Sequence, residues 1–132
     1  MPATYLDSSA IVKLAVQEAE SLELRRYLRR RRPLVSSSLA RTEVLRALLP
    51  SGGDAVAAGR KALTRLDLVR IGNVVLDEAG RLLPVHVRSL DAIHLATAGR
   101  LGSDLGVIVT YDDRLAEAAR ELGHRVVMPG QK

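Results

Sequence analysis

The sequence contains no cysteine, no phenylalanine and no tryptophan, and it has only three tyrosines. The absence of cysteine excludes disulfide bonds and thiolate metal sites, and it is typical of proteins that work in a reducing compartment. Because aromatic residues are so few, the core must be built from aliphatic side chains, which are plentiful in a chain that is 47% hydrophobic. This composition predicts a folded chain and not a disordered one.

Long apolar runs are also missing. No stretch reaches the length of about 18 apolar residues that a membrane-spanning helix needs, and the first residues do not form a basic segment followed by an apolar one. We therefore expect a cytoplasmic protein with no membrane partner. A length of 132 residues suits a single domain that covers residues 1–132.

The charge is unbalanced toward basic residues, with a formal net charge of +5. A basic balance favours polyanionic partners such as nucleic acid, although a GC-rich genome would produce the same bias toward arginine. One predicted helix carries acidic residues early and Arg25, Arg26, Arg29 and Arg30 late, an order that suits the helix dipole. This arginine cluster could bind phosphates or could be a solvated helix end, and the sequence leaves both interpretations open.

The hydrophobic pattern alternates between strand-like and helix-like segments. Short apolar runs without clean alternation predict strands that are buried on both faces, at 3–7, 34–37, 68–71, 106–110 and 125–128. Helices are predicted between them at 9–16, 19–31, 39–49, 54–66, 74–83, 90–101 and 113–122. Strands that alternate with helices predict an α/β fold with a mostly parallel central sheet.

Acidic residues lie where several of these elements begin or end. Asp7 ends the first predicted strand, and Asp112 and Asp113 follow the fourth one. Asp91 opens the helix "SLDAIHLATAGRL", and Glu43 lies one turn into the helix that follows "PLVSSS". Because ligands of parallel α/β sheets bind beyond the carboxyl ends of the strands, acids from four distant segments could meet at one edge of the sheet.

Each acid also has a simpler structural explanation. Asp7 and Asp112 could cap the helices that follow them, and Asp91 near a helix N-terminus gains about 0.3–1 kcal/mol from the dipole. Glu43 could pair with Arg46 one turn later. Capping does not require the four acids to converge, whereas a hard divalent cation such as Mg²⁺ or Mn²⁺ does require it. Such a site can lower the pKa of a bound water and offset charge that develops on a phosphate.

The segments around these acids resemble a known family. Four segments resemble, in order and context, the four acidic motifs of the PIN-domain ribonucleases. They are "YLDSSAIVKL", "SSSLARTEVLRAL", "LDAIHLATA" and "VTYDDRLAEAA". The closest likeness is to the VapC toxins of VapBC toxin–antitoxin pairs. The resemblance spans nearly the whole chain. It implies a three-layer α/β/α fold, a homodimer that cleaves RNA with Mg²⁺ or Mn²⁺, and inhibition by a cognate VapB-type antitoxin.

The resemblance also assigns roles to single residues. The catalytic and metal-site acids that it implies are Asp7, Glu43, Asp91 and Asp112. Ser8 and Thr110 match the small hydroxyl positions beside these acids. The T-x-D spacing of the family selects Asp112 as the fourth acid, with Asp113 in the first turn of the last helix, whereas the residues alone leave the two aspartates as alternatives. His94 lies one turn after Asp91, so it is expected to be a structural histidine or to hydrogen-bond Asp91.

Two other functions compete with the nuclease interpretation. A receiver-type phosphoacceptor domain is also a small α/β domain with a magnesium-binding acidic pocket, but it has paired acids after the first strand and a lysine after the last. Here Asp7 is followed by serines, and Lys13, Lys61 and Lys132 do not match that lysine. The second alternative is a catalytically silent PIN scaffold, against which the intact set of four acids argues. The glycines form no G-x-G-x-x-G motif or P-loop, which argues against a nucleotide cofactor.

Overall fold

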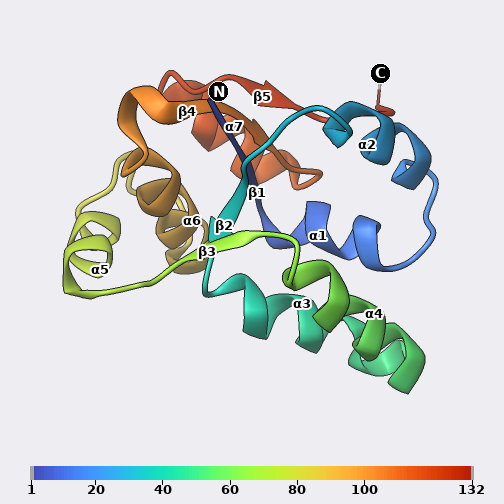
Figure 1. Ribbon diagram of the computed structural model, residues 1–132. Coiled ribbons are helices and arrows are strands. Elements are labelled where there is room, and N and C mark those ends of the chain that lie inside the picture. Colours follow the sequence, from blue (N-terminus) through green and yellow to red (C-terminus); the bar gives the residue numbers. More distant parts are fainter. Residues whose placement is uncertain (1, 132) are drawn as a thin grey trace.

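The computed structural model describes residues 2–131 and contains a five-stranded sheet (Figure 1). Its strand order is β3-β2-β1-β4-β5, and every neighbouring pair is parallel. The strands are β1 Ala3–Leu6, β2 Leu34–Ser37, β3 Asp67–Val69, β4 Leu105–Val109 and β5 Val126–Val127. The predicted α/β fold is confirmed, and the sheet expected to be mostly parallel is parallel throughout the described strands.

Helices connect the strands, as expected for parallel pairs that need a crossover. They are α1 Ser8–Ala15, α2 Ser21–Leu28, α3 Ala40–Leu48, α4 Gly53–Leu63, α5 Asn73–Gly80, α6 Ser89–Gly99 and α7 Asp113–Glu121. The helix predicted at 19–31 is too long, because its end would stack several arginines one turn apart and like charges at that spacing disfavour a helix. None of the helices described between residues 2 and 131 is both long and apolar enough to span a bilayer.

Helices cover both faces of the sheet and give three layers (Figure 1). On one face, Leu6 packs with Ile11 and with the buried side chains of α2, α3 and α4. On the other face, Tyr5 packs with Leu95 of α6 and Leu115 of α7. Alternate residues of β1 therefore point into two separate, largely aliphatic cores, as in a parallel sheet that is buried on both sides. The predicted α/β/α layering is confirmed.

The direction in which the sheet grows changes beside β1. The chain first adds β2 and β3 on one side of β1, and then returns to place β4 and β5 on the other side. α1 leaves the end of β1 toward one core, and α7 follows β4 toward the other. Such a switch point opens a crevice at the carboxyl edge of the sheet, where α/β proteins bind their ligands.

Candidate active site

Asp7 lies at this switch point, directly after β1, and its side chain is buried. One carboxylate oxygen, Oδ2, accepts a hydrogen bond from Thr110 Oγ1 at 2.6 Å, and Oδ1 accepts from Ser9 Oγ at 2.7 Å and from the Ala10 amide at 3.1 Å. Burial raises the pKa of Asp7, and the hydrogen bonds from Thr110 and Ser9 oppose that rise. The hydrogen bond from the Ala10 amide caps α1, so Asp7 is a helix cap as well as a buried acid at the carboxyl end of β1.

Glu43 is held by a chain of buried polar side chains. Its Oε1 accepts hydrogen bonds from Ser8 Oγ at 2.6 Å and from His94 Nε2 at 2.6 Å. His94 Nδ1 lies 2.7 Å from the hydroxyl of Tyr5, so both ring nitrogens have partners. Burial alone would raise the pKa of Glu43, but the hydrogen bonds from His94 and Ser8 outweigh it and hold this pKa below its usual range.

These contacts correct two expectations. The possible pairing of Glu43 with Arg46 is not found, because the Glu43 carboxylate turns toward Ser8 and His94. The alternative in which His94 bonds Asp91 is not found either, because Tyr5 and Glu43 engage both nitrogens of the imidazole. The other expectation for His94, a buried structural histidine, fits its position at 3% exposure.

Asp91 and Asp112 are close enough for their charges to interact. Asp91 is in the first turn of α6 and is partly exposed. Burial raises the pKa of Asp91, and the nearby charge of Asp112 raises it further. Asp112 Oδ1 caps α7 by accepting from the amides of Arg114 and Leu115, at 2.9 and 3.2 Å. Asp112 therefore caps a helix and also lies near another acid. Asp7 likewise caps a helix and is buried.

Hydrogen bonds and charge effects link the four predicted acids in pairs at this edge. Thr110 joins two of them, since its Oγ1 donates to Asp7 and accepts from the Asp112 amide at 3.0 Å. The charge of Glu43 also raises the pKa of Asp91. Asp113, by contrast, is exposed as the first residue of α7. Ser9, which the sequence reasoning did not select, binds Asp7, whereas the predicted Ser8 binds Glu43.

The chemistry of the donors at this edge fits a hard divalent cation. Carboxylate oxygens dominate it, hydroxyl oxygens of Ser8 and Thr110 accompany them, and such oxygens are the ligands that Mg²⁺ and Mn²⁺ prefer. Within residues 2–131, however, no three acidic or imidazole groups are close enough together to hold an ion. Both oxygens of Asp7 already accept hydrogen bonds. Asp7 Oδ2 keeps a second lone pair, so metal binding would require the acidic side chains to move closer together but would not require these hydrogen bonds to break.

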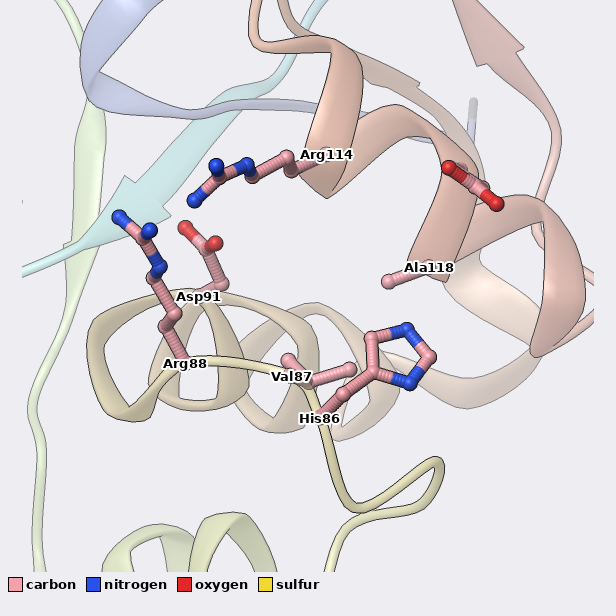
Figure 2. Close-up of a pocket in the computed structure, with 7 residues that line it drawn as sticks. His86, Val87, Arg88, Asp91, Arg114 and Ala118 are labelled. Carbon is pink, nitrogen blue, oxygen red and sulfur yellow. The ribbon is translucent and has the colours of Figure 1, made fainter.

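A pocket of about 300 Å³ opens beside Asp91, between the start of α6 and the start of α7. Figure 2 shows Arg88 and Arg114 extending toward the Asp91 carboxylate from two different elements. Val87 and Ala118 give the pocket an apolar wall, and Glu117 also lines it. Sequence reasoning named neither arginine, although both stand within three residues of a predicted acid.

The predicted arginine cluster lies elsewhere. Arg26, Arg29, Arg30 and Arg31 line a separate hollow around Tyr27, and the Arg31 guanidinium is 4.0 Å from the centre of the Tyr27 ring. The end of α2 leads into the first residue of β2, so this cluster faces the amino edge of the sheet, opposite to the acids. Arg31 also lines a pocket with Ala3 and Gly106, which lie at the amino ends of β1 and β4. The cluster is therefore separate from the acidic crevice.

Comparisons with known proteins show the family of this chain. Residues 4–121 match the PIN domain family. The chain is 64% identical over 129 residues to Ribonuclease VapC46 of Mycobacterium tuberculosis (strain ATCC 25618 / H37Rv), covering 98% of this chain and 99% of that protein. It is 43% identical over 131 residues to Ribonuclease VapC35 of Mycobacterium tuberculosis (strain CDC 1551 / Oshkosh), covering 96% and 97%.

A solved structure supports the same assignment at the level of the fold. The crystal structure of Mycobacterium tuberculosis VapC20, described as a sarcin-ricin loop cleaving toxin, superposes with a TM-score of 0.76 at 21% identity and covers 96% of this chain and 99% of that one. Because the PIN domain match takes in most of the chain and the VapC relatives align with it almost end to end, the chain belongs to the PIN-domain family, in its VapC branch.

Proposed function

We propose that this protein is an endoribonuclease, the toxin of a VapBC-type pair, which hydrolyses RNA phosphodiester bonds with Mg²⁺ or Mn²⁺. The observation that supports the proposal is the set of pairwise links, through hydrogen bonds and charge effects, among Asp7, Glu43, Asp91 and Asp112 at the carboxyl edge of the sheet. These acids come from the ends of β1 and β4 and from the first turns of α3 and α6. The relatives with the highest identity quoted above are named ribonucleases.

Each side chain would contribute a separate part of the chemistry. When bound, a divalent cation lowers the pKa of a coordinated water and offsets charge on the phosphate. Asp7 and Asp91 would hold the cation, and Thr110 and Ser9 fix the orientation of Asp7. The bonds from His94 and Ser8 keep Glu43 ionised, which suits a group that helps to hold a cation or orients a water by accepting its hydrogen bond.

Asp112 is our proposed fourth acid, with Asp113 as an accessory residue. The support for Asp112 is its effect on the pKa of Asp91 and its backbone bond to Thr110. Ser8 is accessory as a positioning partner of Glu43, and Thr110 as a partner of Asp7. Both hydroxyls act through a carboxylate.

Family membership also supports proposals about partners. We propose that residues 1–132 act as one PIN domain, that the protein forms a homodimer in the cytoplasm, and that a VapB-type antitoxin inhibits it. Light scattering at several protein concentrations tests the dimer. A monomer mass at every concentration would contradict it. Titration calorimetry against the product of the adjacent small gene tests the antitoxin, and absence of heat with the wild type would remove that partner.

Cleavage of RNA tests the proposed function directly. The chelator-treated protein should cleave a random-sequence RNA pool only after Mg²⁺ or Mn²⁺ is restored, and Asp7→Asn and Asp91→Asn should each abolish cleavage. Asparagine retains the ability to cap a helix, so the Asp7 variant should still fold. Asp54→Asn, in the first turn of α4 and away from the crevice, is the matched control. Activity that survives in the site variants or in chelator would contradict the proposal.

A further inference from the structure

Two arginines at the pocket beside Asp91 have charges that the structure leaves available. Arg88 precedes α6, Arg114 lies in the first turn of α7, and both are exposed. Among the side-chain hydrogen bonds and ion pairs described for residues 2–131, none involves either guanidinium group. Each guanidinium therefore has five N–H donors that can bind a planar or tetrahedral anion.

The positive charges of these arginines are unfavourable at their positions unless an anion is near. Both stand at helix N-termini, where a cation opposes the helix dipole at a cost of about 0.3–1 kcal/mol. The charge of Asp91 acts on that of Arg88, but no ion pair described for residues 2–131 joins Asp91 to either arginine. A phosphate oxygen is therefore a natural partner for the two guanidinium groups, whether or not a cation is bound at the acids.

The rest of the pocket suits the uncharged part of a nucleotide. Its volume of about 300 Å³ is at the lower end of pockets that hold small organic ligands. Val87 and Ala118 provide apolar surface, and Figure 2 shows the His86 imidazole beside Ala118, on the side away from the arginines. Histidine rings are among the side chains on which unstacked RNA bases stack. The pocket therefore has an end with two arginines that can bind a phosphate, and an end with Val87 and Ala118 that can take the nucleoside, beside which Glu117 also lies.

We propose that this pocket binds the nucleotide adjacent to the scissile bond of the RNA, with Arg88 and Arg114 on its phosphate and its nucleoside against Val87 and Ala118. The inference rests on the proposed RNA cleavage and adds to it a substrate-binding site. It also separates these two arginines from those of α2, which lie at the opposite edge of the sheet.

Binding without catalysis is the first test. Fluorescence anisotropy with a labelled random-sequence single-stranded RNA, in chelator, compares the wild type with the double variant Arg88→Met, Arg114→Met. The control is Arg29→Met, Arg30→Met, which removes the same charge from the α2 hollow. The pocket variant should bind about tenfold more weakly, because two charge-assisted contacts are lost, and the control should change less than about threefold. Equal weakening in both variants would mean general attraction by net charge and would overturn the proposal.

Cleavage of a modified RNA is the second test. An RNA that the wild type cleaves is made with one neutral methylphosphonate next to the cleaved bond. The wild type should cleave it about tenfold more slowly, whereas the pocket variant should show no further loss, because the interaction is already missing. If the pocket variant binds RNA normally while the wild type cleaves RNA, the proposed nucleotide site is wrong and the proposed ribonuclease activity is unaffected. A wild type that neither binds nor cleaves RNA would overturn both.

Discussion

Asp7 and Glu43 have opposite pKa shifts although both belong to the four predicted acids. The pKa of Asp7 is raised by burial, so its protonated form stabilises the fold below the unfolded pKa of about 3.9, and this contribution is lost as pH rises through the folded pKa. The pKa of Glu43 is lowered by His94 and Ser8 against the effect of burial. The ionised form of Glu43 therefore stabilises the fold above the unfolded pKa of about 4.3, and this contribution is lost as pH falls through the folded pKa.

Two variants separate these contributions. In chelator, the stability of Asp7→Asn relative to the wild type should rise as pH increases above 4, because only the wild type must bury a charge. The stability of Glu43→Gln relative to the wild type should fall as pH rises through the acidic range, because only the wild type then gains a carboxylate that accepts hydrogen bonds from His94 and Ser8. Urea unfolding at a series of pH values measures both, with about 1.4 kcal/mol for each pKa unit. Parallel pH profiles for the two variants would contradict the opposite shifts.

His94 connects the two cores through polar contacts, which gives a second prediction for single residues. His94→Leu should cost about 1–3 kcal/mol of unfolding free energy, because the Tyr5 hydroxyl and Glu43 each lose a partner in or near the interior. In the presence of Tyr5→Phe the same change should cost less, since no buried hydroxyl is left unpaired. A double-mutant cycle from urea unfolding tests this coupling, and strictly additive losses would show that the Tyr5–His94 contact contributes nothing.

The end of α7 illustrates a requirement set by a whole helix. Gly123 has a φ of 89° and donates from its amide to Arg120 O at 2.9 Å, while the His124 amide donates to Ala119 O at 3.0 Å. These paired bonds close the helix in a left-handed turn that favours glycine. Gly123→Ala should therefore lower the unfolding free energy by about 1–2 kcal/mol.

Gly99→Ala is the matched control, at the last position of α6. A methyl group there meets no atom within 4 Å, and the residue has no positive φ. This change should leave stability unchanged or raise it by up to about 1 kcal/mol, because alanine is the better helix former. Chemical unfolding of both variants gives the comparison. Equal effects of the two alanine substitutions would mean that the positive φ of residue 123 does not require glycine.

Elements and their order were accessible from the sequence, but side-chain partners were not. Each described strand lies within two residues of its prediction, because apolar runs bounded by helices leave little freedom in α/β folds. The edge position of Asp7 and Asp112 also followed, since carboxyl ends of parallel strands share one edge. The bond from His94 to Glu43 joins residues 51 positions apart, and no local pattern indicates such a contact.

The positions of the arginines in space were also not predictable from the sequence. The run of arginines in one predicted helix was a candidate for binding phosphates, but it lies at the end of α2, at the amino edge of the sheet. The pair near the acids consists of two isolated residues, Arg88 and Arg114, which only the packing of α6 beside α7 brings to one pocket. Composition records how many charges a chain has, whereas the chain path decides where they meet.

For the molecule as a whole, metal binding should appear as added thermal stability. A cation that binds only the folded site stabilises it by an amount that reaches about 2.7 kcal/mol at a hundred times its dissociation constant. We expect Mg²⁺ or Mn²⁺ to raise the melting temperature of the wild type and of Asp54→Asn. Asp7→Asn and Asp91→Asn should lose most of this increase. Thermal melts with and without metal measure it independently of RNA cleavage, and an equal increase in all four proteins would place the cation elsewhere.

The hydrogen bond from Thr110 to Asp7 has a consequence for the timing of activity during synthesis. Its two residues are 103 positions apart, and the Asp112 amide that binds Thr110 lies still later in the chain. A ribosome completes β1 before it adds β2, β3 and β4. The growing chain therefore cannot assemble the proposed nuclease site until Thr110 and Asp112 have emerged. An inhibitor translated beforehand would already be present when the first active molecule forms.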